Sequence, residues 1–213
     1  MAVAPMFPLG TVLLPGGILP LHVFEPRYRE MIADCLAAET EYPEFGVVLI
    51  ERGSATGGGD QRAMVATLAR VVEVATLEDG RYVLVTVGME RLRVSAWLPD
   101  DPYPIADVEP WPEVPLTTVE IDDSGLAAQI DELDRQAADL LTMAQELGDL
   151  PRELVHPVAR FDPGQALYDI ASKAPIGPAD RYRILCAGDS FERLEVLTAA
   201  MEDVAAMLRF RTA

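Results

Sequence analysis

The chain has 213 residues, half of them hydrophobic and a quarter charged, a composition that supports a buried core and excludes intrinsic disorder. Its net charge of −18 is shared by residues 1–113 and 114–213, each near −9, so the surface repels nucleic-acid phosphates and anionic lipid headgroups. No run approaches the roughly twenty apolar residues of a membrane span, and no basic segment precedes an apolar one at the N-terminus. We therefore expect a soluble, cytoplasmic protein that does not bind membranes.

The first half is predicted to consist mainly of strands. Short runs rich in Val, Leu and Ile alternate with Gly, Pro and Asp, which is typical of strands and turns. These runs are residues 11–14, 19–24, 45–50, 64–74, 81–87 and 91–98. Between two of them, Asp79-Gly80 predicts a type I′ hairpin turn, because both residue types tolerate positive φ.

One helix is expected to interrupt these strands. Pro26 suits a first helical turn, and apolar residues then recur at helical spacing, at Tyr28, Met31, Ile32, Cys35 and Leu36. The two cysteines, Cys35 and Cys186, lie beside leucines on apolar faces of helical patterns. Since no disulfide framework or Cys-x-x-Cys pair exists, we expect both to be buried free thiols.

Residues 99–115 contain six prolines and separate the two halves of the chain. Beyond them the apolar period changes from two to about 3.6, the period of a helix. One apolar stripe begins at Leu126 and ends at Leu147, and Gly148 is expected to close that helix. Later helices are predicted to open at Asp162-Pro163, at Gly177-Pro178 and at Asp189, where Glu192 would complete a capping box.

The expected architecture is therefore α+β. Residues 1–113 should form a mostly antiparallel β-unit with one helix, either closed or sharply curled. Residues 114–213 should form a bundle of about four helices.

The chain lacks motifs for catalysis, cofactors or metals. The Gly-rich segment 53–61 has no following Lys-Ser/Thr, and the single lysine, Lys173, precedes Ala-Pro, so no nucleotide-phosphate loop is present. There is no Gly-x-Ser-x-Gly nucleophile elbow, and His22, His156 and the cysteines lack metal-ligand spacing. Acidic pairs such as Asp100-Asp101 are typical of solvated turns, and nothing singles out two carboxylates for acid–base catalysis. We expect no enzymatic activity, no cofactor and no metal site.

The most informative segment is Phe24-Glu25-Pro26-Arg27-Tyr28, at the corner between a predicted strand and the first helix. Charges between apolar elements are unfavourable unless they pair. We expect Glu25 to pair with Arg27 or with Arg91, which comes from a later strand, and thereby to fix the corner. The segment is then a structural signature rather than a binding site.

The same segment takes part in a resemblance that extends along the chain. Its order and spacing relative to Phe7-Pro8-Leu9, Leu14-Pro15-Gly16 and Gly88-Met89-Glu90-Arg91 resemble those of the LON domain, the N-terminal module of the ATP-dependent Lon proteases. The resemblance implies a PUA-like β-barrel followed by a helical bundle. It also implies substrate or degron recognition without hydrolytic activity, because the ATPase and peptidase domains of those proteases lie outside the region that this chain resembles.

The function implied by this resemblance is non-catalytic polypeptide binding. The expected partners are unfolded or degron-bearing polypeptides, with a protease or chaperone as a further partner. Trp97, Tyr103 and Trp111 are candidate anchors, since aromatic residues carry a large share of binding energy. The alternative is that these three residues pack the two halves together.

Two other functions are weighed against polypeptide binding. A regulatory or oligomerising scaffold would use the long C-terminal helix, residues 191–210, which is predicted to be apolar on one face. RNA binding, for which PUA-like barrels are used elsewhere, is disfavoured by the acidic β-half. Only a local patch at Arg91 and Arg93 would support it.

Overall fold

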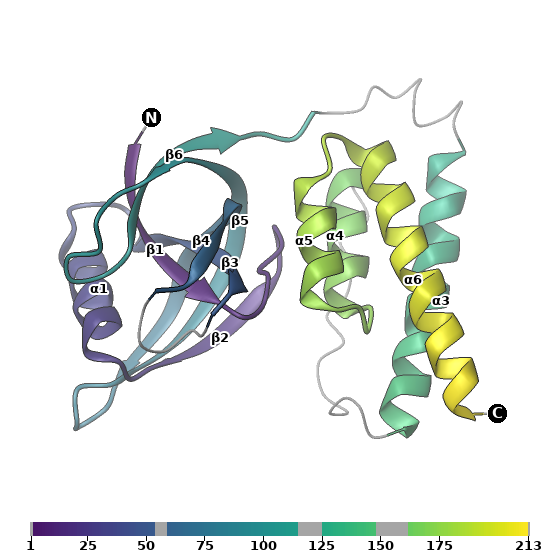
Figure 1. Cartoon of the computed structure of the whole chain (residues 1–213), viewed down its shortest axis with the longest axis horizontal. Coiled ribbons are helices and arrows are strands. Elements are labelled where there is room, and N and C mark those ends of the chain that lie inside the picture. Colours follow the sequence, from purple (N-terminus) through teal and green to yellow (C-terminus); the bar gives the residue numbers. More distant parts are fainter. Residues whose placement is uncertain (1, 54–58, 115–124, 148–161, 213) are drawn as a thin grey trace. The chain divides into compact units, whose positions relative to one another are not determined.

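The computed structural model describes residues 2–53, 59–114, 125–147 and 162–212. Contacts divide the chain into two compact units, Met1–Pro112 and Glu113–Ala213. The first unit contains the described strands and helix α1, and the second contains helices α3 to α6 (Figure 1). The chain is α+β, as predicted from the sequence.

The strands of the first unit form a closed barrel. The elements are β1 (Ala2–Leu9), β2 (Ile18–Val23), α1 (Pro26–Ala37), β3 (Glu44–Arg52), β4 (Gln61–Thr76), β5 (Tyr82–Trp97) and β6 (Ile105–Trp111). The sheet order is β2-β5-β4-β3-β1-β6, and a further pairing of β5 with β6 closes the ring. Of the pairings described, that between β1 and β3 is parallel and the others are antiparallel. The prediction of a mostly antiparallel β-unit, either closed or sharply curled, is confirmed, and the unit is closed.

Strand β5 has two partners along the same side. Its residues 82–87 pair with β2 and its residues 91–97 pair with β6, while β4 pairs along the other side. Between the two partners, the Gly88 N–H donates to the Gly17 carbonyl, and the Gly88 carbonyl accepts from the Gly16 N–H. A Cβ at position 88 would collide with the carbonyl oxygen of Leu14. Glycine is therefore required where β5 changes partner.

Several predicted strand boundaries are wrong. Residues 11–14 form no strand, and Leu13 and Leu14 are apolar because they are buried in the unit. The segments predicted at 81–87 and 91–98 belong to one strand, β5. Strands β1 and β6 were not predicted, and both contain proline, which usually argues against a strand.

The β4–β5 hairpin is present, but its turn is not type I′. The Leu77 carbonyl accepts from the Gly80 N–H, so Glu78 and Asp79 are the central residues. Gly80 follows with φ 77°, and the Asp79 carboxylate accepts from the Arg81 N–H. This arrangement is that of a hairpin with a longer loop, in which one glycine in the left-handed region restores the strand register.

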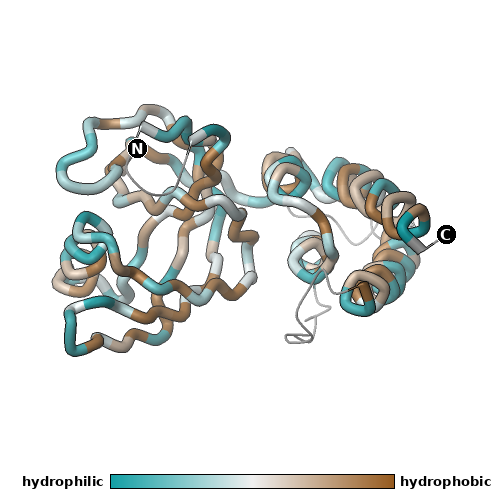
Figure 2. Tube along the Cα trace, turned by 60° about the horizontal axis from the view of Figure 1, so that its bottom comes forward, coloured by the Kyte–Doolittle hydropathy of each residue, from teal (hydrophilic) through white to brown (hydrophobic). Residues whose placement is uncertain are grey.

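Helix α1 contributes one face to the barrel core. Pro26 occupies its first turn, as predicted, and Tyr28, Met31, Ile32 and Cys35 are buried. These side chains pack in a single cluster with residues of the strands, among them Phe7, Phe45, Val47 and Leu84. Leu36, expected on the same face, is instead exposed. Hydrophobic residues follow the strands of this unit in Figure 2, as expected for a sheet that packs around a core.

The second unit contains four described helices, α3 (Leu126–Glu146), α4 (Pro163–Lys173), α5 (Pro178–Cys186) and α6 (Ser190–Thr212). The Asp162 carboxylate caps α4 by accepting from the N–H groups of Gly164 and Gln165. At α6, Asp189 accepts from the N–H of Glu192, whose own side chain accepts from the Gly188 N–H. Both predicted helix starts are confirmed. The predicted stop at Gly148 lies outside the described residues.

Two details of the helical unit differ from expectation. Helix α6 is not apolar on one face alone, because Met207 and Phe210 are exposed while Leu197, Met201 and Leu208 are buried. Cys186 is half-buried, whereas Cys35 is buried as expected.

A buried polar cluster anchors the start of the helical unit. Arg193 of α6 is 0% exposed and donates from Nη2 to Glu113 Oε2 at 2.8 Å. The Tyr168 hydroxyl of α4 donates to the other oxygen of Glu113 at 2.7 Å, and the Arg193 guanidinium lies 3.9 Å from the Tyr168 ring centroid. The first residue of this unit is thereby fixed to two helices.

Gly88→Ala should lower the free energy of unfolding by about 1–3 kcal/mol, because the added methyl group meets backbone rather than a movable side chain. The measurement is urea denaturation followed by circular dichroism. Gly10→Ala is the matched control, since nothing lies within 4 Å of the Cβ that it would add. Equal stability of both variants would contradict the close approach at position 88.

Candidate functional site

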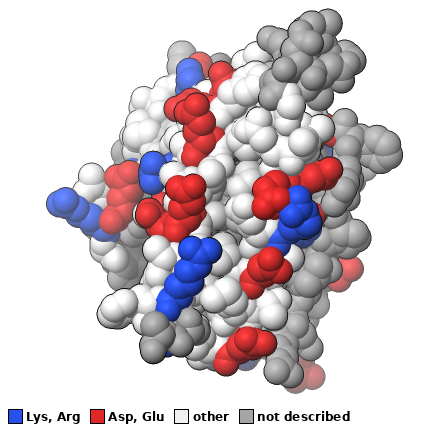
Figure 3. All heavy atoms as spheres, turned by 90° about the vertical axis from the view of Figure 1, so that its right-hand side faces the viewer, with Lys and Arg blue, Asp and Glu red and all other residues white. Residues whose placement is uncertain are grey.

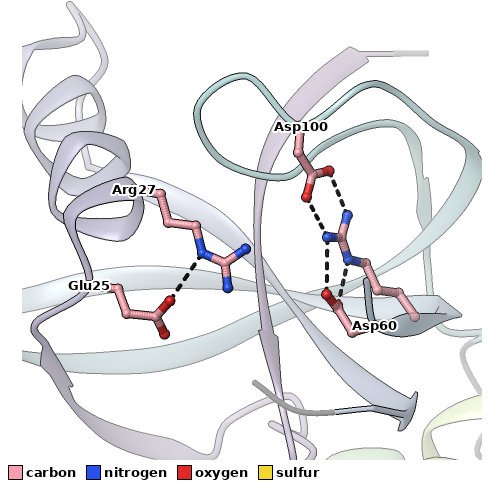
Figure 4. A network of polar contacts seen from close by, with 5 residues as sticks. Glu25, Arg27, Asp60 and Asp100 are labelled. Carbon is pink, nitrogen blue, oxygen red and sulfur yellow. Dashed lines mark hydrogen bonds and ion pairs between the residues drawn. The ribbon is translucent and has the colours of Figure 1, made fainter. Parts of the chain in front are cut away.

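The corner between β2 and α1 is fixed by an ion pair. Glu25 is the N-cap residue of α1, yet its side chain makes no capping hydrogen bond. It accepts instead from Arg27 Nε at 3.2 Å, and both side chains are about one-fifth exposed. Glu25 thus pairs with Arg27, one of the two arginines considered from the sequence (Figure 4).

Tyr28 connects this ion pair to the core. Its ring stacks on Phe7 with centroids 4.3 Å apart and planes inclined by 15°, and the Arg27 guanidinium lies 4.5 Å from the Tyr28 centroid. Burial raises the pKa of Tyr28 to about 12. A tyrosine in this state does not serve as an acid or base near neutral pH. Phe24, by contrast, is 53% exposed.

A second charged cluster lies in the same unit. Arg62 of β4 donates from Nε to Asp60 at 2.7 Å and from Nη1 and Nη2 to Asp100 at 2.9 and 2.6 Å. Figure 4 shows Asp60 and Asp100 on either side of the guanidinium group that they share. The side chains of Arg62 and Asp60 are 9% and 2% exposed. Asp100 is exposed, as expected of a turn acid, but nothing in the sequence indicated that it pairs with Arg62.

Electrostatics in this cluster favour the charged states. Burial alone would raise the pKa of Asp60, but the hydrogen bonds from Arg62 and from the backbone outweigh it and the pKa is lowered. The hydrogen bond to Asp100 is the largest contribution that raises the pKa of Arg62. The sequence offered little sign of this cluster, because Asp60 and Asp100 lie forty residues apart in segments that resemble ordinary loops.

Arg91 does not lie at the β2–α1 corner. Arg91 lies on β5 and is 1% exposed. It pairs in register with Trp111 of β6. The guanidinium groups of Arg91 and Arg93 lie 4.1 and 3.9 Å from the Trp111 ring centroid. Since Arg91 is buried, the exposed Arg91–Arg93 patch considered for RNA does not form.

The three candidate aromatic anchors do not form one cluster. Trp97 pairs in register with Ala106, and Trp111 pairs with Arg91 at the opposite end of the β5–β6 ladder, about 20 Å away at a strand's usual rise. Trp97 lies beside Arg62, whose guanidinium is 4.9 Å from its ring centroid. The Tyr103 hydroxyl donates to Asp34 at 2.8 Å, and burial together with this bond raises the pKa of Tyr103 to about 12. Each of the three residues thus has a partner within the β-unit.

The remaining reactive side chains form no site within the described residues. No group of three His, Cys, Asp or Glu there is placed to hold a metal ion. Burial raises the pKa of the Cys35 thiol to about 11, and its sulfur donates to the Glu44 carbonyl. Lys173 Nζ lies 4.0 Å from Asp134, and His156 lies outside the described residues. No helix among those described is long and apolar enough to cross a membrane.

The outward side of β2 and β5 is mainly apolar, with exposed residues on β2 and at Val83 and with Val85 and Val87 half-buried. Register pairs Ile18 with Val87, Pro20 with Val85 and His22 with Val83, while Leu84 and Thr86 between them are buried. Ile18 and Val83 are 48% and 41% exposed, and the exposed Phe24 ring follows with its centroid 6.1 Å from that of His22. We call Ile18, Pro20, Val83, Val85 and Val87 the outer β2–β5 face. Such a surface is a common site of protein association.

Nearly the whole chain resembles a known domain. A family model described as the ATP-dependent protease La (LON) substrate-binding domain matches residues 3–203. The chain belongs to this family. The LON domain family is associated with proteolysis and is itself non-catalytic.

Relatives and solved structures agree with this assignment. Lon protease of Anaeromyxobacter dehalogenans is 28% identical over 86% of this chain and 21% of its own length. Lon protease 2 of Sorangium cellulosum is 29% identical over 97% of this chain and 25% of its own length. This LON domain therefore spans a quarter or less of these relatives. A Lon N-terminal domain protein from Xanthomonas campestris is similar with a TM-score of 0.63 and 26% identity, covering 93% of this chain and 98% of that chain. The N-terminal domain of a Mycobacterium avium complex Lon protease shares the fold, with a TM-score of 0.64 and 22% identity. The match covers 95% of this chain and 99% of that chain.

Arg62→Met should lower the free energy of unfolding of this LON domain by about 3 kcal/mol at neutral pH, because it leaves the buried Asp60 carboxylate without its main partner. Urea denaturation measures the change. Arg81→Met is the control. The Arg81–Asp79 pair is exposed, so its loss should not change the free energy of unfolding measurably. Equal losses in both variants would show that the Arg62 cluster has no special role.

The same cluster predicts a pH dependence. The pKa of Asp60 is lowered in the folded state, so the ionised carboxylate stabilises the fold. This stabilisation is complete above the ordinary carboxyl pKa of about 4. It is lost as the pH falls through the lower pKa of the folded state. In Arg62→Met this stabilisation is absent. The stability difference between wild type and variant should therefore narrow as the pH falls below about 4. Urea midpoints between pH 6 and pH 3 would test this, and a constant difference would contradict it.

Proposed function

We propose that this LON domain is a non-catalytic module that binds unfolded or degron-bearing polypeptides in the cytoplasm. The observation that carries the proposal is the apolar outer β2–β5 face, in which Ile18, Pro20 and Val83 are exposed, with the exposed Phe24 beside it. A chain with net charge −18 would normally present polar groups on the open side of a sheet. Apolar side chains of an unfolded polypeptide would gain free energy by covering this surface.

The relatives support the same proposal. They are Lon proteases, and the matching family is described as substrate-binding. A protease or chaperone partner that receives the bound polypeptide is part of the proposal. We also propose that residues 1–113 and 114–213 act as separate domains, and that the Phe24–Tyr28 corner serves the structure of the first.

Charge favours polypeptides over nucleic acids as ligands. Arg62 and Arg91 are occupied inside the β-unit, by carboxylates and by an aromatic ring respectively. On the face shown in Figure 3, basic side chains stand singly or beside acidic ones. A surface that follows a phosphate backbone needs clustered cations. The binding role of Trp97, Tyr103 and Trp111 stays a prediction.

The double variant Phe24→Ser, Val83→Ser should bind an unfolded polypeptide about tenfold more weakly than wild type, because two exposed apolar contacts are removed. Fluorescence anisotropy with a labelled unfolded polypeptide of near-zero net charge measures the dissociation constant. The folded form of that polypeptide and an RNA oligonucleotide serve as ligand controls.

Val3→Ser is the matched protein control, since Val3 is 62% exposed on β1, outside the outer β2–β5 face. It should leave binding unchanged. Saturable binding that is insensitive to the double variant would move the site elsewhere. Binding of RNA alone would overturn the proposed function.

A further inference from the structure

Strand β2 lies outside the closed ring of the barrel. The ring is formed by β1, β3, β4, β5 and β6, and β2 pairs with β5 alone among the described strands. Within the part of the chain that the structure describes, one side of β2 therefore has no strand partner along its length. Such an open edge is a template for another extended chain.

The register shows which backbone groups face outward. The Gly17 carbonyl accepts from the Gly88 N–H, and the Leu19 carbonyl accepts from the Thr86 hydroxyl, so both residues point toward β5. Because successive residues of a strand alternate, the groups of Ile18, Pro20 and His22 point to the open side. Pro20 has no N–H. It is one of the residues that point to the open side, where proline is tolerated because no hydrogen bond to β5 is lost. The open edge thus offers three carbonyl acceptors and two N–H donors.

The open edge of β2 lacks the usual protection by charge. Residues 18–23 contain no Asp, Glu, Lys or Arg, although a quarter of the whole chain is charged. The end of β4 that extends beyond its pairing with β3 carries Glu73, which is a common way to block an edge. On β2 the one blocking device is Pro20, which removes a single donor.

We infer that this LON domain binds its polypeptide by strand addition, with an extended segment pairing along the open edge of β2. The inference rests on the proposed function and specifies how the polypeptide is bound. Main-chain hydrogen bonds would supply affinity that does not depend on sequence, while alternate apolar side chains of the added segment would extend the outer β2–β5 face. This mode suits a domain that recognises unfolded chains of many sequences.

A foreign segment fits this edge better than a second copy of β2. In a symmetric antiparallel pair of β2 strands, Pro20 of each copy lacks its N–H, so the pair loses two hydrogen bonds. A foreign strand without proline loses one. Pro20 therefore disfavours self-association while it leaves the edge open to other chains.

Two opposite substitutions test the inference by changing the number of outward donors. Pro20→Val raises it from two to three, and His22→Pro lowers it to one without removing an N–H that pairs with β5. The probe is a fluorescein-labelled nonapeptide of alternating Val and Thr, followed by anisotropy. One net hydrogen bond corresponds to about fivefold in affinity, so Pro20→Val should bind about fivefold tighter and His22→Pro about fivefold weaker. Circular dichroism and urea midpoints verify that both variants are folded.

The outcomes separate this inference from the proposed function. If both variants bind like wild type while Val83→Ser weakens binding, recognition uses side chains, and strand addition is wrong although polypeptide binding stands. If wild type binds neither the nonapeptide nor an unfolded polypeptide, both proposals fail. If Pro20→Val dimerises by light scattering without a gain in peptide affinity, the edge accepts a second copy, and the inference is overturned.

A change in the peptide gives an independent measurement on the wild-type protein. A nonapeptide N-methylated at alternate residues keeps one hydrogen-bonding edge and should bind as the unmodified peptide does. A nonapeptide N-methylated at every residue has no N–H on either edge and should lose most of its affinity. Equal binding of the two modified peptides would overturn strand addition.

Discussion

The β-unit depends on the way that β5 divides one of its sides between two partners. Residues 82–87 pair with β2 and residues 91–97 with β6, and the exchange takes place at Gly88, where the backbone of the 14–17 segment approaches closely. Pairing with β6 closes the barrel and removes the edges of the ring. Pairing with β2 adds a strand outside the ring, with an open edge and an apolar outward side. The features proposed to bind polypeptides thus follow from this one exchange.

Several arginines of this acidic protein serve as structural groups that stack on aromatic rings. Arg27 lies over Tyr28, Arg62 over Trp97, Arg91 over Trp111 and Arg193 over Tyr168. A planar, weakly hydrated guanidinium can stack on a ring and still donate to a carboxylate, which a lysine ammonium cannot do as well. Cations used in this way are withdrawn from the surface. The exterior is therefore left acidic, which favours solubility and disfavours nucleic acid.

A LON domain that binds unfolded chains has to accept many sequences. An apolar surface is tolerant of sequence because hydrophobic association is not directional. A strand edge is tolerant because every residue except proline offers the same backbone groups. The combination on β2 and β5 would select extended, apolar segments, which folded proteins rarely expose. Pro20 limits the cost of an open edge, since it weakens pairing between copies of the protein.

The sequence by itself determined the class of the fold and most helix starts. These features depend on local signals: the period of apolar residues, Pro26 in a first turn, and the caps Asp162 and Asp189. The Phe24–Tyr28 segment and its spacing from later motifs also carried the resemblance to the LON domain, which the family match confirms. The tertiary structure alone decided which charges pair and which edge stays open. Arg62 reaches Asp100 across 38 residues and Arg193 reaches Glu113 across 80, and β2 pairs with β5 from outside the ring instead of becoming part of it. Such contacts join segments that are far apart in the chain, and nothing in either local sequence indicates its partner. Only the closed barrel and the packed helices bring these segments together.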